Sequence, residues 1–219
     1  MGATEIYRAV LKRLGWVSIA VGLADIGMMV YCVLHGINYQ SSLNVFAVIA
    51  GILFLRGSLG AVRVVTWFSA FMLAGLTSAL VIVFPFVTPI DLLMTELRLS
   101  PLDSVASILY GVVGLGFILW TYLQLRKPAV VEARLAAGQS GAPPKGAFVV
   151  GVLLAGAMAA IFSFILHGEA GAQALRLAKT KEGMAYKYSV SSLSWSGDHG
   201  RASVTAYNDS EIKSVNVEW

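Results

Sequence analysis

The residue with the clearest chemical potential is Asp25, an acidic side chain inside an apolar run. The run extends over about 14–35, which is long enough to cross a membrane. Asp25 lies roughly 16 Å into it at about 1.5 Å per residue. A carboxylate near the bilayer centre costs ~2.5–3.5 kcal/mol unless it is paired, protonated or beside water. The sequence therefore predicts either a proton or ion site or an interhelical hydrogen bond, with Asn44, Thr77 and Ser78 as candidate partners.

Side chains with soft or nitrogen donors follow Asp25 on the same predicted helix face. They are Met28, Cys32 and His35. His167 ends another apolar run, on the same predicted side of the membrane as His35. Thioether, thiolate and imidazole ligands suit copper. The alternative is that Met28 and Cys32 pack in a helix bundle and the histidines lie at the membrane surface. No Met-rich or Cys-x-x-Cys motif supports copper, and we expect no cofactor.

The composition is that of an integral membrane protein. The 219-residue chain is 57% hydrophobic and 13% charged, with a mean hydropathy of +0.74, whereas soluble domains carry about 25% charged residues. Lys and Arg are spread over loops, which argues against a nucleic-acid partner. The sequence has no P-loop, dinucleotide fingerprint, HExxH or GxSxG motif, so we expect a protein that is not an enzyme. Its lone cysteine excludes an internal disulfide.

Five apolar segments are candidates for membrane-spanning helices in contact with lipid. They cover about 14–35, 38–56, 63–87, 104–124 and 146–167. The second is the weakest because its dense apolar part is short. "RGSLG" at 56–60 separates it from the third span. The fold class predicted is a membrane all-α helical bundle of about five transmembrane helices, with a small C-terminal α+β domain outside the membrane.

Lys and Arg are distributed unevenly between the two sides that five spans define. With the N-terminus inside, the outer loops contain only Arg98, and the inner segments contain Arg8, Lys12, Arg13, Arg56, Arg63, Arg126, Lys127, Arg134 and Lys145. Positive residues favour cytoplasmic loops. The sequence therefore predicts a multi-pass protein of a bacterial inner membrane, with a cytoplasmic N-terminus and a periplasmic C-terminus. An even number of spans would place the C-terminal tail on the cytoplasmic side instead.

The outer loop after the third span has the pattern of a short amphipathic helix over 88–100. Thr88 can cap it and Pro89 suits its first position. An apolar face follows at helical spacing: Ile90, Leu93, Met94 and Leu97. We expect this helix to lie in the outer membrane interface. It could cap the bundle, or it could act as a substrate lid or a partner-docking helix.

Small residues recur at every fourth position of the fifth span: Ala147, Gly151, Ala155, Ala159 and Ser163. Such a stripe lets a second helix approach closely, either in the same bundle or in another subunit. Segment 126–145 is predicted to be a flexible cytoplasmic linker between a four-span unit, 1–125, and the fifth span, 146–167. Because a linker precedes it, we expect the fifth helix to contact other membrane subunits or a second copy.

The tail, 168–219, alternates between apolar and polar residues after a short helical stretch. The alternation slips at Ser191–Ser192, which predicts a β-bulge, and "GDHG" and "NDS" mark two turns. The expected domain is a helix with a three-stranded antiparallel meander, whose core would contain Trp195, Trp219 and the tyrosines.

Two functions remain open from the sequence, with copper handling a distant third. The first is a non-enzymatic accessory, scaffold or assembly subunit of an inner-membrane complex. The second is a small ion- or proton-coupled transporter or channel-like protein centred on Asp25.

Overall fold

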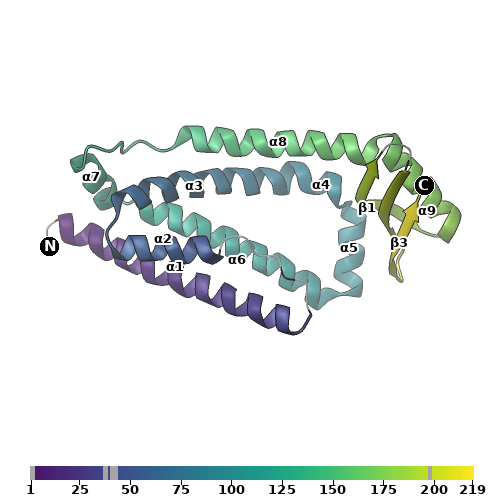
Figure 1. Ribbon diagram of the computed structural model, residues 1–219, viewed down its shortest axis with the longest axis horizontal. Coiled ribbons are helices and arrows are strands. Elements are labelled where there is room, and N and C mark those ends of the chain that lie inside the picture. Colours follow the sequence, from purple (N-terminus) through teal and green to yellow (C-terminus); the bar gives the residue numbers. More distant parts are fainter. Residues whose placement is uncertain (1–2, 37–38, 40–43, 197–198) are drawn as a thin grey trace. The chain divides into compact units, whose positions relative to one another are not determined.

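The computed structural model describes residues 3–36, 39, 44–196 and 199–219, and it is mostly helical (Figure 1). Four of the described helices are long and apolar enough to cross a membrane: α1 (Ala3–Leu34), α3 (Leu59–Ser78, continued to Val83), α6 (Pro101–Leu125) and α8 (Lys145–His167). They correspond to the first, third, fourth and fifth predicted spans. The chain also ends in a small antiparallel sheet, as the sequence predicts.

The second predicted span, 38–56, is replaced by a shorter helix. Helix α2 (Asn44–Leu55) has 12 residues, about 18 Å at about 1.5 Å per residue. A bilayer core is about 30 Å thick, so α2 alone is too short to cross it. Residues 38 and 40–43 of that predicted span lie outside the described residues. Within the described residues, four helices are long enough to span, where the sequence predicts five.

Helix α2 packs directly against the first half of α1 through two glycines. A Cβ on Gly15 would lie 2.8 Å from the carbonyl oxygen of Gly51, and one on Gly51 would lie 2.7 Å from that of Gly15. The two backbones are thus in contact, an arrangement that small residues permit in membrane helix pairs. Beside this crossing, Leu14 and Phe54 are almost fully buried.

The break predicted at "RGSLG" is present, and the third span follows it. Gly57 has φ +71°, a left-handed conformation that glycine adopts without a steric penalty, and the Ser58 hydroxyl accepts a hydrogen bond from Ala61 N–H at 3.2 Å. Helix α3 then continues through a π-helical turn, η1 (Ala79–Val83), into α4 (Phe84–Val87). Pro85 cannot donate a backbone hydrogen bond, which fits the wider turn just before it.

The chain divides into two compact units. Unit 1 comprises Met1–Met72 and Gly116–Ala147. Its core joins α1, α2, the start of α3, the end of α6 and α7 (Pro128–Ala136). Helix α7 lies in the segment predicted as a linker, and its Val130 and Arg134 are 0% and 5% exposed. Much of that segment is therefore packed structure.

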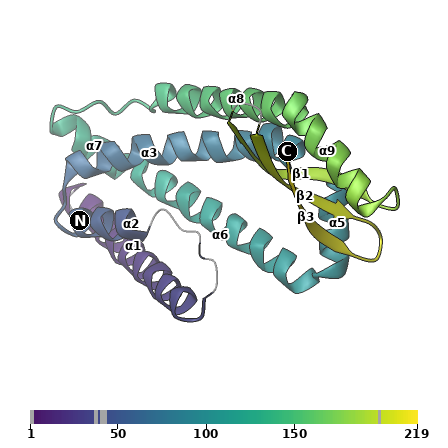
Figure 2. The ribbon, with the colours of Figure 1, turned by 45° about the vertical axis from the view of Figure 1, so that its right-hand side comes forward.

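Unit 2 comprises Leu73–Leu115 and Phe148–Trp219. It contains α5 (Ile90–Leu99), α9 (Glu169–Glu182) and the strands β1 (Lys187–Ser196), β2 (His199–Tyr207) and β3 (Ile212–Glu218). The strands form an antiparallel meander in the order β1-β2-β3. Its register shifts between Val190 and Ser192, where the β-bulge is predicted. Figure 2 shows α9 beside the sheet.

The buried side chains between α9 and the sheet are small. Ala174 and Ala178 of α9 meet a row of alanines and valines from all three strands: Val190, Ala202, Val204, Ala206, Val215 and Val217. Trp195, predicted to lie in this core, is 48% exposed. Trp219 packs over Gly200, where a Cβ would lie 2.2 Å from its ring. Tyr186, Tyr188 and Trp219 are partly buried and pack against this row of small residues, as the sequence predicts for Trp219 and the tyrosines.

Candidate functional site

Two ion pairs connect helix α5 to one end of the sheet. Lys187 Nζ, at the start of β1, lies 2.5 Å from Asp91 Oδ2 in the first turn of α5. Arg98 Nη1, in the last turn, lies 3.6 Å from Asp209 Oδ1 in the turn after β2. The hydrogen bond to Asp91 raises the pKa of Lys187. All four side chains are more than half exposed, so these pairs orient the two elements and add little stability.

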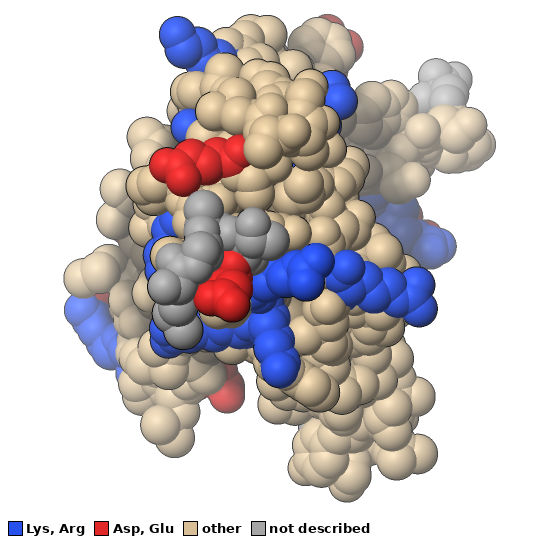
Figure 3. Space-filling model, turned by 90° about the vertical axis from the view of Figure 1, so that its left-hand side faces the viewer, with Lys and Arg blue, Asp and Glu red and all other residues tan. Residues whose placement is uncertain are grey.

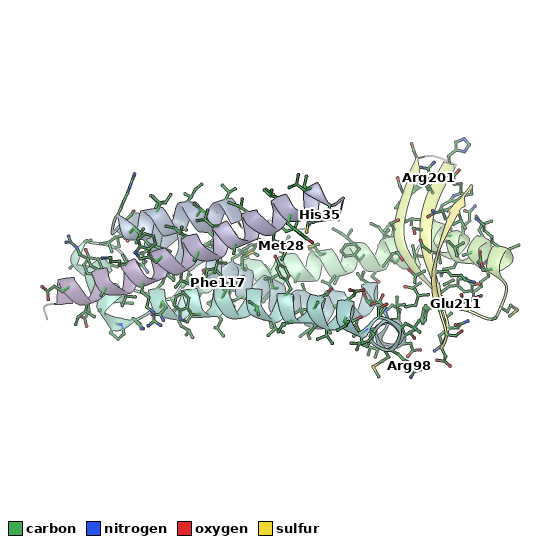
Figure 4. All side chains as sticks on the ribbon, turned by 90° about the horizontal axis from the view of Figure 1, so that it is seen from below. Met28, His35, Arg98, Phe117, Arg201 and Glu211 are labelled. Carbon is green, nitrogen blue, oxygen red and sulfur yellow. The ribbon has the colours of Figure 1, made fainter. Side chains whose placement is uncertain are left out.

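A groove of about 440 Å³ lies along this junction. Met94 of α5 and Met184, just before β1, line it and are 57% and 95% exposed. Tyr207 also lines it but is buried, which raises the pKa of its hydroxyl. Figure 4 shows Arg98 near the end of the sheet that carries Glu211, with Arg201 at the opposite end. The groove thus combines exposed thioethers with charges that are paired with each other.

The turn between β2 and β3 is held by its own polar contacts. The Asn208 side-chain oxygen accepts hydrogen bonds from the backbone N–H groups of Ser210 and Glu211. The Tyr186 hydroxyl donates to the Glu211 carboxylate, and Lys213 Nζ lies 2.9 Å from both groups. The contacts with Tyr186 and Lys213 lower the pKa of Glu211. This network fixes the turn that presents Asp209 to Arg98.

We expect Lys187→Glu to loosen α5 from the sheet, because it places two carboxylates side by side. Backbone amides of α5 should exchange with deuterium faster by up to about fivefold, the scale of an exposed ion pair, as measured by mass spectrometry in detergent. Adding Asp91→Lys should restore slow exchange. Arg201→Glu, which breaks the exposed pair with Glu218 at the opposite end of the sheet, is the control. Unchanged α5 exchange in Lys187→Glu would show that the pair does not hold the junction.

The amphipathic loop helix predicted over 88–100 corresponds to α5, which begins later than expected. Pro89 precedes the first helical residue, and no side-chain cap forms. On its predicted apolar face, Ile90 and Met94 are exposed, and Leu93 and Leu97 are partly buried. The buried residues are Leu92 and Thr95. The amphipathic face therefore remains available to lipid or protein, while an adjacent face packs in unit 2.

Asp25 has a polar partner that the sequence analysis did not identify. The Tyr39 hydroxyl donates a hydrogen bond to Asp25 Oδ1 at 2.5 Å and lies 3.0 Å from the Asp25 carbonyl oxygen. Asp25 is only partly exposed. Asn44, also predicted as an intramembrane polar residue, begins α2, but its side chain lies outside the described residues. The contact with Tyr39 gives the Asp25 carboxyl a hydrogen-bond donor within unit 1.

The residues of the predicted copper site differ in exposure. Met28 is 56% exposed, Cys32 is 9% exposed, and His35 stacks on Tyr31 with its Nδ1 2.8 Å from the Tyr31 carbonyl oxygen. Figure 4 labels Met28 and His35 along α1. The His167 side chain lies outside the described residues. Within the part of the chain that the structure describes, no group of three His, Cys, Asp or Glu side chains could hold a metal ion.

The small-residue stripe on α8 is buried within the chain. Ala147, Gly151, Ala155 and Ala159 are buried and Ser163 is partly buried. In unit 2, a Cβ on Gly75 of α3 would lie 3.7 Å from the carbonyl oxygen of Gly151. Packing within the chain therefore accounts for the contact at Gly151, and contact of α8 with a partner stays a prediction.

Comparisons of this chain with protein-family models, with curated proteins and with solved structures gave no match.

Proposed function

We propose that this protein is a non-enzymatic accessory or assembly subunit of an inner-membrane protein complex. The observation that carries the proposal is the groove between α5 and the sheet. Its charges, Asp91 with Lys187 and Arg98 with Asp209, are paired with each other. The groove therefore has no excess of positive or negative charge that would bind a small ion. Two other exposed side chains of the groove, Met94 and Met184, are flexible thioethers of the kind found on adaptable protein-binding surfaces.

The occupant we propose for the groove is an extramembrane polypeptide segment of a partner membrane protein. Ile90 and Met94 lie on the exposed apolar face of α5, at 69% and 57% exposure, and an apolar face of this kind favours the membrane interface. A partner that reaches the groove would therefore share the membrane. Paired charges and thioethers complement a neutral peptide better than a highly charged ligand.

The proposed orientation has a cytoplasmic N-terminus and a periplasmic sheet domain. In unit 1, the end of α2 and the start of α3 share a core with the first half of α1. This supports a return of the chain toward the N-terminal side before α3 begins. Three further spans, α3, α6 and α8, would then leave the sheet on the opposite side. The excess of Lys and Arg in unit 1, nine against three Asp and Glu, supports a cytoplasmic location for its polar parts.

A second candidate function is a proton- or ion-coupled transporter centred on Asp25. The hydrogen bond between the Tyr39 hydroxyl and the Asp25 carboxyl is the observation that favours it, because a carboxyl and a hydroxyl in contact can pass a proton. The same contact also satisfies a purely structural carboxyl, so the two functions need separate tests.

The test of the accessory function is purification of the full chain from native membranes in a mild detergent, followed by quantitative mass spectrometry. We expect a defined set of other membrane subunits at stoichiometric levels. Met184→Glu should reduce their recovery at least about fivefold by placing a charge in the interface. Thr180→Glu is the matched control, because Thr180 is exposed on α9 and does not line the groove. Protein that runs alone, or as a clean homo-oligomer, would contradict the proposal.

A further inference from the structure

Arg134 is a buried cation with an unsatisfied donor. Its side chain belongs to α7 and is 5% exposed. Within the described residues, Arg134 Nε has no hydrogen-bond partner, and Arg134 takes part in none of the ion pairs. A buried guanidinium nitrogen without a hydrogen-bond partner is unfavourable, so a negative partner at Nε would stabilise this side chain.

Two further arginines lie close to Arg134. The core of unit 1 packs Val62, Leu125 and Val130 together. It thereby joins the start of α3, the end of α6 and α7, which carry Arg63, Arg126 and Arg134. Burial lowers the pKa of Arg134, and the charges of Arg126 and Arg63 lower it further. Arg126 Nη1 donates to the Gly141 carbonyl oxygen at 2.6 Å, which holds that side chain beside the segment that follows α7.

Basic residues outnumber acidic ones in unit 1, and the acid nearest to Arg134 in the sequence, Glu132 of α7, is exposed. All four ion pairs among the described residues lie in unit 2. Unit 2 has seven Lys and Arg against nine Asp and Glu, and unit 1 has nine against three. Figure 3, which faces the N-terminus and α7, shows Lys and Arg side chains gathered with few acidic ones among them. Among the described residues, the three buried side-chain atoms without a hydrogen-bond partner, Thr121 Oγ1, Arg134 Nε and Gln139 Oε1, all belong to unit 1.

We propose that Arg134, Arg126 and Arg63 bind a phosphate group. Guanidinium groups match phosphate oxygens with parallel hydrogen bonds, and a phosphate would supply the counter-charge that Arg134 lacks. The source we infer is the headgroup of an anionic phospholipid, since basic pockets between membrane helices on the cytoplasmic side recognise such headgroups. Trp16 and Trp67 of unit 1, 58% and 44% exposed, are of the type enriched at the level of lipid headgroups.

The test measures lipids retained by the purified full chain in detergent, with native mass spectrometry after adding phosphatidylglycerol, cardiolipin or phosphatidylcholine. We expect the wild type to retain the anionic lipids preferentially. Arg134→Gln and Arg63→Gln should each reduce retention by about fivefold. Arg63 is exposed, so that variant should fold normally. Lys127→Gln, which removes an exposed cation in the neighbouring turn, is the control and should retain lipid as the wild type does.

Thermal unfolding separates this role from a structural one. In lipid-free detergent Arg134→Gln should be at least as stable as the wild type, because it removes an uncompensated buried charge. Anionic lipid should then raise the Tm of the wild type and not of the variant. A rise with millimolar inorganic phosphate that anionic lipid does not reproduce would assign the site to free phosphate. Equal retention of all three lipids with no response to phosphate, or full retention by both arginine variants, would overturn the proposal.

Discussion

Replacing Gly51 with alanine should destabilise the protein by forcing α1 and α2 apart. The new Cβ would lie 2.7 Å from the Gly15 carbonyl oxygen, 2.7 Å from Ile19 Cγ1 and 3.1 Å from Ile19 N. Two of these three atoms belong to the α1 backbone and cannot rotate away, so α1 and α2 must separate. Overpacking of this kind costs about 1–3 kcal/mol. We expect a clear fall in Tm and in the yield of monodisperse protein in detergent.

Gly27→Ala provides the matched control for this prediction. Gly27 lies on α1, in the same unit, and a Cβ there would meet nothing within 4 Å. Alanine is the better helix former by about 1 kcal/mol, so Gly27→Ala should match or exceed the wild-type Tm. If the Tm of Gly51→Ala equalled that of Gly27→Ala, the close α1–α2 contact would not be a determinant of the fold.

The contrast between α2 and the other apolar segments shows where sequence reasoning reaches its limit. Length and hydropathy identify α1, α3, α6 and α8, because a long apolar run has few alternatives to a spanning helix. Residues 38–56 are also apolar on average, but the helix described there, Asn44–Leu55, has 12 residues. The pairing of Gly15 with Gly51 that anchors α2 joins residues far apart in the sequence, and no local pattern signals it.

The tail is predictable because its signals are local. The signals are alternation with period two, a slip in that alternation at Ser191–Ser192, and two turn motifs. Each lies within a few residues of the structure that it specifies. The bulge and the strand order follow from them. Tyr186, Tyr188 and Trp219 pack against the core as predicted. The 48% exposure of Trp195 has no local signal, because burial there depends on how closely α9 approaches the sheet. Ala174 and Ala178, at 0% exposure, set that distance.

The candidate sites depend on contacts between distant segments. Asp91 and Lys187 are separated by 96 positions, and neither is unusual in a polar loop or strand. The ends of α5 carried a partial signal, since Asp91 is in its first turn and Arg98 in its last, where each charge also favours the helix dipole. Arg134 lies in a segment that is rich in Gly and Pro and predicts a linker. Its burial arises only when α7 packs into the core of unit 1.

Tyr39→Phe should lower the stability of unit 1 because it removes a donor from the Asp25 carboxyl. Loss of a hydrogen bond to a partly buried acidic group costs about 1–3 kcal/mol. We expect a lower Tm in detergent. Asp25→Asn should have a smaller effect, since the amide oxygen can still accept from Tyr39 and the substitution removes the cost of a charge in an apolar environment. A Tyr39→Phe protein that melts as the wild type does would show that this contact is not stabilising.

The same two variants separate the candidate functions when partner recovery and ion flux are measured together. If Asp25 is structural, Asp25→Asn should keep both the partner subunits and any flux in proteoliposomes. If Asp25 carries a proton, Asp25→Asn should abolish proton-coupled flux in a folded protein, because an amide does not titrate. Tyr39→Phe would then reduce that flux without abolishing it, since the phenol contacts the Asp25 carboxyl through one hydrogen bond. Stability alone cannot make this distinction, because both functions require the carboxyl to be satisfied inside the helix bundle.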